Sequence, residues 1–264
     1  MLVDIAIKLC QSIYFAMNKR LSCILTCGLL LFCAVAQAKP APFKFVLYYP
    51  QVPPYMYQQE QQKDVKGLIP ALINEFFAEQ GIKLSYVIDN RKGAEHRLYS
   101  GDVDAMLLAK PWSEHPEQLL FSEPVIMHRD YLFATQAFSD NSQPDDWLSN
   151  ATICTRQYYV YEALDPYFAK GATRLDSSSE AAQMRMLQSG RCDYAYMNEH
   201  VAQWLAKNQF PQLKLYRSPV SFGNVGLTIA MHKKWQDLLP KLNAYLKKQQ
   251  ENGRIEQLLQ AEIQ

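Results

Sequence analysis

The chain has 264 residues and a formal net charge of +1 at neutral pH, a length that suits one large domain or two small ones. A nearly neutral chain without a long basic run lacks the electrostatic signature of a nucleic-acid-binding protein. Hydrophobic residues make up 48% of the sequence, so the chain can bury a substantial core. We therefore expect a globular protein with no nucleic-acid partner.

The N-terminal segment resembles a secretory signal peptide. Residues 19–20 are basic, residues 21–35 are apolar, and residues 36–38 read Ala-Gln-Ala, the small-x-small pattern of a signal-peptidase site. The apolar run is shorter than the roughly 20 residues that a membrane-spanning helix needs. We expect cleavage after Ala38 and export to the periplasm.

Cleavage at this site would leave a mature chain with two cysteines, Cys154 and Cys192. Two cysteines in an exported chain predict one disulfide, because the periplasm is oxidising. The alternative is a pair of buried free thiols. The basic pair lies shortly after Met17, so translation can begin at either Met1 or Met17.

The first part of the chain alternates between strand and helix patterns. Residues 43–48 and 84–88 have the composition of strands, and residues 67–80 and 91–100 that of helices. Residues 49–57 between the first strand and helix hold three prolines and are expected to be a loop. This order predicts βαβ units on a parallel sheet.

Residues 100–124 carry the pattern that places a site. Gly101 ends a helix, residues 103–108 form a short apolar run typical of a buried strand, and residues 111–117 are polar with two prolines. Residues 121–124 then begin a new extended segment. Open α/β sheets bind ligands at the carboxyl ends of their strands, so we expect the loop over residues 111–117 to border the site.

The second part of the chain repeats this alternation. We expect extended segments over residues 125–135, 152–155, 191–197, 213–216 and 225–231. We expect helices over residues 145–148, 159–168, 180–189, 201–205, 235–250 and 255–263. The pattern Ser-Gly-x-x-Asp occurs at both 100–104 and 189–193, each time between a helix and a strand. This partial repeat predicts two lobes of similar build.

These patterns resemble the type-2 periplasmic solute-binding proteins, specifically the family that serves ABC transporters for polar amino acids. The first-lobe motif of that family is matched by Gly101, Asp104, Ser113, Phe121, Ser122 and Pro124. Its closing pattern is matched by Lys233, Leu238, Leu242, Asn243, Leu246, Gly253 and Ile255. The resemblance covers residues 42–263.

The resemblance implies an α/β fold of two lobes, each a mixed, mostly parallel sheet flanked by helices. Lobe one would comprise residues 39–134 and 226–264, and lobe two residues 135–225. Hinge strands would lie near residues 131–136 and 225–231. A small-molecule ligand would bind between the lobes and favour their closed state. The implied partner is an ABC permease or a membrane sensor, and we expect a monomer with no cofactor and no metal.

The resemblance also points to positions that would contact a ligand. Relatives that bind α-amino acids hold the carboxylate with a first-lobe arginine and the ammonium with a second-lobe aspartate. In this sequence the first position falls on His115 or Pro116, and the second on Asn198. A stacking aromatic would lie near Val52, with Tyr55 close by.

Both charged anchors are thus replaced by other residues. Burying a zwitterion without counter-charges costs on the order of several kcal/mol, so a common α-amino acid is a less favoured ligand than a polar, anionic or aromatic molecule. Arg156 follows a second-lobe strand and precedes a helix, where a guanidinium and a helix N-terminus attract anions. We expect the ligand to contact Arg156 together with Tyr55, Trp112, Ser113, His115, Asn198 and one of the neighbours Tyr158 and Tyr159.

Each of these positions also has an ordinary structural explanation. Arg156 can form a surface ion pair and Trp112 can pack within its loop. His115 can be a solvated loop residue, and Asn198 can cap a helix that begins at Glu199.

Catalytic motifs are lacking. The sequence has no HExxH, GxSxG or P-loop pattern, and its five histidines are scattered. We therefore expect a binding protein and not an enzyme. The alternatives are a periplasmic lyase of the same fold acting on prephenate-like acids, with Glu199 or Glu162 as acid and base, and a module that signals through protein contacts.

Overall fold

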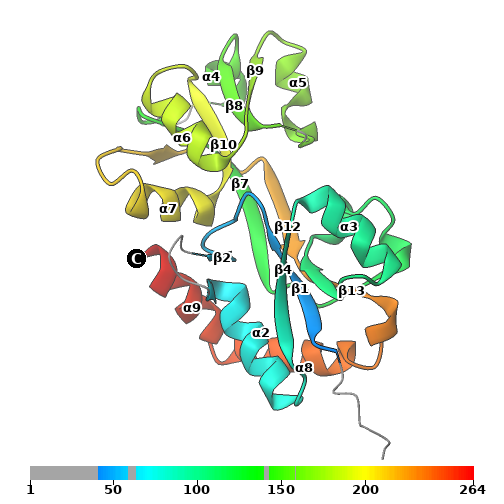
Figure 1. The fold of residues 1–264 in the computed structure, drawn as a ribbon. Coiled ribbons are helices and arrows are strands. Elements are labelled where there is room, and N and C mark those ends of the chain that lie inside the picture. Colours follow the sequence, from blue (N-terminus) through cyan, green and yellow to red (C-terminus); the bar gives the residue numbers. More distant parts are fainter. Residues whose placement is uncertain (1–40, 59–63, 140–142, 158) are drawn as a thin grey trace, which may run out of the picture. The chain divides into compact units, whose positions relative to one another are not determined.

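Two β-sheets organise the chain (Figure 1). The computed structural model describes residues 41–58, 64–139, 143–157 and 159–264, and residues 42–264 group into one unit. The expected signal peptide and Tyr158 lie outside the described residues. Mixed sheets flanked by helices confirm the predicted α/β fold class.

The first sheet has the strand order β4-β1-β5-β13-β6. Its strands are β1 (Phe43–Tyr48), β4 (Leu84–Asp89), β5 (Ala105–Leu107), β6 (Leu119–Phe121) and β13 (Ile229–His232). Strand β1 is parallel to both β4 and β5, as the alternation of strands and helices predicts, whereas β13 is antiparallel to β5 and β6. Strand β13, which lies between β5 and β6, therefore comes from the C-terminal part of the chain.

Helices cover both faces of the first sheet. Phe45 packs in a core with Leu72 of α2 (Leu68–Glu79), whereas its neighbour Val46 packs with Leu98 of α3 (Arg91–Ser100). Successive side chains of a strand point to opposite faces, so the two helices lie on opposite sides. A small hairpin of β2 (Tyr57–Gln58) and β3 (Val65–Lys66) precedes α2.

The second sheet has the order β11-β7-β10-β8-β9, and β12 also pairs with β7. Its strands are β7 (Ile126–Ala134), β8 (Thr152–Arg156), β9 (Thr173–Ser177), β10 (Tyr194–Asn198), β11 (Tyr216–Arg217) and β12 (Gly223–Leu227). Strand β8 is parallel to β9 and β10, and the strands beside β7 are antiparallel to it. The long strand β7 therefore pairs with three strands of this sheet, β10, β11 and β12.

The remaining helices follow the expected order. They are α4 (Pro144–Leu148), α5 (Asp165–Phe168), α6 (Glu180–Gln188), α7 (Glu199–Asn208), α8 (Leu239–Glu251) and α9 (Arg254–Ile263). Helix α9 contacts α2 and α8, and also α7, which follows a strand of the second sheet. Within the described residues, no helix combines the length and the apolar character that crossing a membrane requires.

The repeated Ser-Gly-x-x-Asp pattern has the same structural role in both sheets. Gly101 and Gly190 follow helices with φ angles of 78° and 70°, in the left-handed region that favours glycine. The Asp104 carboxylate then accepts the backbone N–H of Lys44 at 2.7 Å, and the Asp193 carboxylate accepts that of Thr152 at 2.7 Å. Each aspartate therefore fixes the start of the neighbouring parallel strand, and the predicted similarity of build is confirmed at these positions.

Several element boundaries differ from the sequence prediction. The sequence pattern does not predict strand β9, because its residues 173–177 are polar and mostly exposed at the sheet edge. The helix expected over 159–168 begins only with a 3-10 turn at Glu162–Leu164. The extended segment expected over 213–216 forms a strand only from Tyr216.

The segment expected as one strand over residues 225–231 is two strands in different sheets. Strand β12 ends at Leu227 in the second sheet, and β13 begins at Ile229 in the first. Between them, the Thr228 backbone carbonyl accepts the Leu108 N–H at 3.0 Å. The lobe boundaries at residues 134, 135, 225 and 226 stay predictions.

The cysteines form the predicted disulfide. Cys154 in β8 and Cys192 before β10 are bonded, with 5.7 Å between their Cα atoms and 38 residues between them in sequence. Both side chains are buried. The bond joins the start of β10 to its parallel neighbour in the second sheet.

Replacing both cysteines with alanine should lower the free energy of unfolding by about 4 kcal/mol, because the cross-link restricts a loop of this length in the unfolded chain. Thermal unfolding of the mature protein should then shift down by roughly 8–16 °C for a chain of this size. The double variant serves as its own control, since added reductant should not change its unfolding temperature. Thiols that titrate in the untreated native protein would contradict the bond.

Candidate functional site

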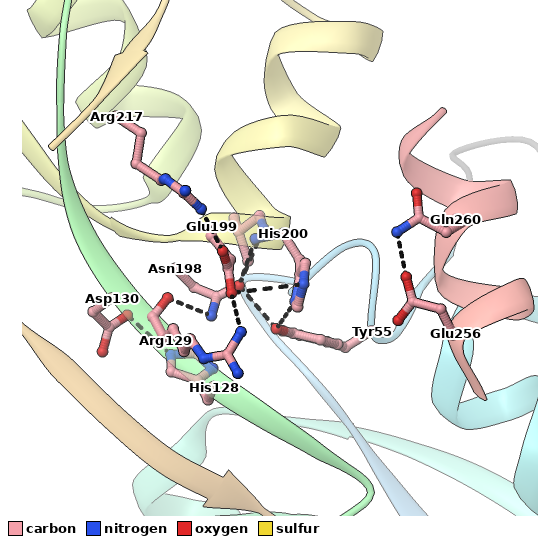
Figure 2. Close-up of polar contacts among 11 residues, drawn as sticks. Tyr55, His128, Arg129, Asp130, Asn198, Glu199, His200, Arg217, Glu256 and Gln260 are labelled. Carbon is pink, nitrogen blue, oxygen red and sulfur yellow. Dashed lines mark hydrogen bonds and ion pairs between the residues drawn. The ribbon is translucent and has the colours of Figure 1, made fainter. Parts of the chain in front are cut away.

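Tyr55 links the proline-containing loop after β1 to the second sheet (Figure 2). Its side chain is fully buried, and its hydroxyl donates to Asn198 Oδ1 at 2.8 Å and lies 3.0 Å from His200 Nδ1. The loop is held by the start of α2, since Ile69 N donates to the Tyr55 carbonyl at 2.9 Å. Gly67 makes this approach possible, because a Cβ there would lie 2.7 Å from the Tyr55 oxygen.

Asn198 ends β10 and caps α7. Its Oδ1 accepts the backbone N–H groups of His200 and Val201 at 3.0 and 3.2 Å, in addition to the Tyr55 hydroxyl. Its Nδ2 donates to the Arg129 carbonyl at 3.1 Å. The structure thus brings two predicted ligand contacts, Tyr55 and Asn198, into direct contact with each other. It also assigns Asn198 the helix-capping role that was the alternative explanation.

Glu199 is committed to ion pairs. Its side chain is 8% exposed, and its carboxylate lies 2.8 Å from an Arg217 nitrogen and 3.5 Å from an Arg129 nitrogen. The Arg217 guanidinium also lies 4.5 Å from the centre of the Tyr131 ring. Each carboxylate oxygen of Glu199 has a guanidinium partner, so this side chain is poorly placed for the acid and base role of the lyase alternative.

Arg156 ends β8 in a buried ion pair. Its guanidinium contacts both carboxylate oxygens of Glu180 in the first turn of α6, at 2.6 and 2.5 Å, and stacks 4.9 Å from the centre of the Tyr159 ring. Its side chain is 11% exposed. The ion-pair alternative is therefore realised, although the pair is buried and not at the surface.

A buried carboxylate holds the loop after β5. Glu95 of α3 accepts the Ser113 hydroxyl and the Glu114 N–H, both at 2.8 Å, and the Tyr99 hydroxyl at 2.5 Å. His115 is attached through its backbone N–H to the same tyrosine hydroxyl at 2.9 Å, and its side chain is 56% exposed. Ser113 is thus bonded within the chain and His115 faces solvent, as its alternative explanation held.

Trp112 extends from this loop toward the second sheet. It is 40% exposed, and its ring lies perpendicular to that of His128 with 5.0 Å between the centres. Its carbonyl accepts a hydrogen bond from the guanidinium of Arg91 at the start of α3. Trp112 is therefore packed in part and accessible in part.

Two residues of β7 were missed by sequence reasoning. His128 Nε2 lies 3.1 Å from Asp130 Oδ1, and each side chain is 14% exposed. Among buried side-chain atoms of the described residues, His128 Nδ1 is one of those without a hydrogen-bond partner. No sequence motif includes these positions. They could have been found from the expected strand over residues 125–135, because alternate residues of a strand share one face and His128 and Asp130 are two residues apart.

The structure also contains a cavity of about 730 Å³. It is lined by Pro50 and Tyr57 on the side of the segment after β1, and by Glu180 of α6 and Trp204 of α7 on the other side. None of the predicted ligand contacts lines it. One residue that lines the cavity, Glu180, is the ion-pair partner of the predicted contact Arg156.

Metal ligation finds no support in the part of the chain that the structure describes. There, no group of three or more histidine, cysteine, aspartate or glutamate side chains is arranged to hold an ion.

Comparison with known protein families identifies a match over most of the chain. The family described as bacterial extracellular solute-binding proteins, family 3, matches residues 45–262. No match was found among curated protein sequences.

Solved structures share the fold at low sequence identity. A binding component of an ABC transporter from Wolinella succinogenes, complexed with lysine, has a TM-score of 0.72 and 19% identity over 85% of this chain and 96% of its own. The ligand-binding core of GluR0 complexed with L-glutamate has a TM-score of 0.69 and 14% identity, over 86% and 100%. An ancestral amino-acid-binding protein, AncCDT-1, described as a precursor of cyclohexadienyl dehydratase, has a TM-score of 0.66 and 19% identity, over 86% and 97%.

The Tyr55 hydroxyl should contribute to stability. Replacing Tyr55 with phenylalanine removes a donor to buried Asn198 and should lower the free energy of unfolding by about 1–2 kcal/mol in urea titrations. Tyr86→Phe is the matched control, because the Tyr86 hydroxyl donates to Asn74 at an exposed position. This substitution should lower the free energy of unfolding by less than ~0.5 kcal/mol. Equal effects of the two substitutions would contradict a special role for Tyr55.

His200 should make stability depend on pH. Burial lowers its pKa in the folded protein, against the opposing influence of Glu199. As pH falls below about 6.5, the unfolded chain therefore gains a proton at this residue before the folded chain does, and stability falls. Between pH 7.5 and 5.5 the wild type should lose more unfolding free energy than His200→Gln, which keeps a polar partner for Tyr55. Parallel pH profiles would exclude this contribution.

Proposed function

Since the chain belongs to the bacterial extracellular solute-binding proteins, family 3, we propose that it is a periplasmic receptor that closes two lobes on a small amino-acid-like solute. In this proposal each lobe is built on one sheet, so the lobes meet at the segment before β7 and at Thr228, and the expected boundary between residues 134 and 135 falls at the end of β7 within the second sheet. The receptor delivers the solute to an ABC permease or presents it to a membrane sensor. It acts as a monomer and catalyses no reaction.

One observation carries the proposal. The Tyr55 hydroxyl, from a loop after a first-sheet strand, is hydrogen-bonded to Asn198, at the end of a second-sheet strand. The Trp112 ring makes a second connection of this kind to His128 of β7. Loops after strands therefore meet where each sheet presents polar and aromatic side chains, an arrangement that suits capture of a small ligand.

The strand connections between the sheets support closure. Strand β7 follows β6 after a short segment, and β12 leads into β13 across the single residue Thr228. Short connections of this kind are positions where a few backbone angles can absorb a change between open and closed arrangements. A solute that contacts both sheets in the closed state would shift the population toward it.

The solute class follows from relatives and from the side chains. Two of the solved structures described above are complexes with lysine and with L-glutamate. In this chain, Trp112 is a predicted contact with a large aromatic ring that is 40% exposed, whereas Ser113 and Arg156 are bonded to Glu95 and Glu180. We therefore assign Trp112 the largest share of solute contact, with Tyr55, Asn198 and Arg156 shaping the surroundings.

A lyase is the less favoured alternative. AncCDT-1 is a precursor of a dehydratase and is itself an amino-acid-binding protein, and Glu199 of this chain is held by Arg129 and Arg217. Incubation with prephenate-like acids should therefore leave the acids unchanged by NMR. Formation of a decarboxylated and dehydrated product would contradict the binding-protein proposal.

Ligand binding is tested by thermal unfolding of residues 39–264 with amino acids, dicarboxylates, aromatic acids and sugars. A ligand at 100 times its dissociation constant should stabilise the protein by about 2.7 kcal/mol, a shift of roughly 5–10 °C. Trp112→Ala should reduce this shift, whereas Val220→Ala, equally exposed at 40%, should not. A panel in which sugars alone shift the transition would contradict an amino-acid-like solute.

A further inference from the structure

Among the described residues, buried carboxylates that form ion pairs are, with one exception, paired with arginine or lysine. The paired ones, with side chains 5% to 17% exposed and nitrogen–oxygen distances of 2.5 to 3.6 Å, are Asp89, Glu95, Asp104, Glu180 and Glu199. Asp130 is as buried as these, at 14%, yet the ion-pair partner it has among the described residues is His128. Burying a carboxylate without a cation is costly, and among these carboxylates Asp130 alone has no arginine or lysine partner; it has His128 and a side-chain hydrogen bond with Tyr196 instead.

The register of the second sheet places Asp130 at the centre of the site. Asp130 on β7 lies directly opposite Asn198 on β10 and opposite Gly223 on β12. Directly opposed side chains share a face of an antiparallel pair, so Asp130 is a neighbour of the Asn198 amide that binds Tyr55. A Cβ on Gly223 would lie 2.7 Å from Asp130 Oδ2. The absence of a side chain at Gly223 therefore leaves room for the carboxylate.

His128 completes an acceptor pair. If Nε2 carries the proton of a neutral imidazole, it donates to Asp130 Oδ1 at 3.1 Å, and Nδ1 then presents a lone pair. Nδ1 is a buried atom without a hydrogen-bond partner in the described chain. A buried acceptor without a donor is unfavourable, so the carboxylate and the imidazole both lack something that a bound cationic donor can supply.

Aromatic side chains surround the pair. The Trp112 ring lies 5.0 Å from that of His128, and the Tyr196 side chain is hydrogen-bonded to the Asp130 carboxylate. Burial, followed by the charge of Asp130, raises the pKa of the Tyr196 phenol above its usual range, so this hydroxyl stays neutral. Aromatic faces and a carboxylate together favour a cation over an anion.

We propose that Asp130 binds an ammonium group of the solute, with His128 and Trp112 beside it. This rests on the proposed function, and it changes the ligand expected from the sequence. Asn198 lacks the charge that would hold an ammonium, but the neighbouring strand supplies a carboxylate directly opposite it. An amine-bearing acid is then favoured over a dicarboxylate, because the amine provides the counter-charge that the chain does not.

Binding to paired probes tests the inference. L-Lysine, L-glutamate and L-phenylalanine are compared by calorimetry with hexanoate, glutarate and 3-phenylpropanoate, the same acids without amines. We expect an amine-bearing probe to bind and its amine-free counterpart to bind more weakly. Asp130→Asn should weaken the affinity for the amine-bearing probe by ~10- to 100-fold, since a hydrogen bond to a charged group contributes about 1.5–3 kcal/mol. The affinity for the amine-free probe should stay unchanged.

Stability without any solute gives a second test. Asp130→Asn removes a charge that has no arginine or lysine partner and keeps the shape, so the unfolding temperature of the solute-free protein should rise or stay unchanged. Asp104→Asn is the matched control, because the buried Asp104 carboxylate is paired with Lys234 at 2.6 Å and accepts the Trp235 N–H at 2.8 Å, so removing its charge weakens contacts that stabilise the fold. This control should unfold at a lower temperature.

The outcomes separate the two proposals. If the wild type binds a probe and Asp130→Asn binds it equally well, or if amine-free acids bind best, the ammonium assignment is wrong and the receptor function stands. A solute-free Asp130→Asn variant as destabilised as Asp104→Asn would make Asp130 a structural residue and also overturn the assignment. Binding of none of the six probes by the wild type would contradict both the amino-acid-like solute and the inference.

Discussion

The hydrogen bond between Tyr55 and Asn198 is the interaction on which the arrangement of this site depends. It joins a buried phenol from the first sheet to an amide that also caps α7. Because one oxygen serves both purposes, the loop after β1, the end of β10 and the start of α7 are fixed by a single group. Most buried polar groups are hydrogen-bonded, so movement of the loop after β1 away from β10 requires the Tyr55–Asn198 bond to break.

Charge pairing gives the site its chemical character. In the part of the chain that the structure describes, several buried carboxylates are paired with arginine: Glu95 with Arg91, Glu180 with Arg156, and Glu199 with two arginines. These pairs use up residues that looked available for a ligand or for catalysis. Asp130 has an imidazole and a phenol as partners and no arginine or lysine, so it stands out as a group suited to an external cation.

The two sheets share one local arrangement of a glycine and an aspartate, and short connections join one sheet to the other. In each, a glycine with positive φ ends a helix and an aspartate three residues later fixes the start of the adjacent strand. Strand β7 then pairs with β10 and β12, and β12 continues through Thr228 into a strand of the other sheet. A solute receptor needs this combination, since rigid sheets position the contacts and short connections permit closure.

The sequence by itself predicted most of the helices and several strands in their order, one disulfide, the family motifs and the repeated Ser-Gly-x-x-Asp units, because these depend on local periodicity, turn chemistry and cysteine number. It could place Tyr55, Trp112, Arg156 and Asn198 near loops. It could not show that Asn198 is bonded to Tyr55 or that Arg156 is paired with Glu180. It also missed β9, which is too polar to show a strand period, and Asp130, which no motif marks. Those features depend on which strands lie side by side, and strand register is decided by long-range packing.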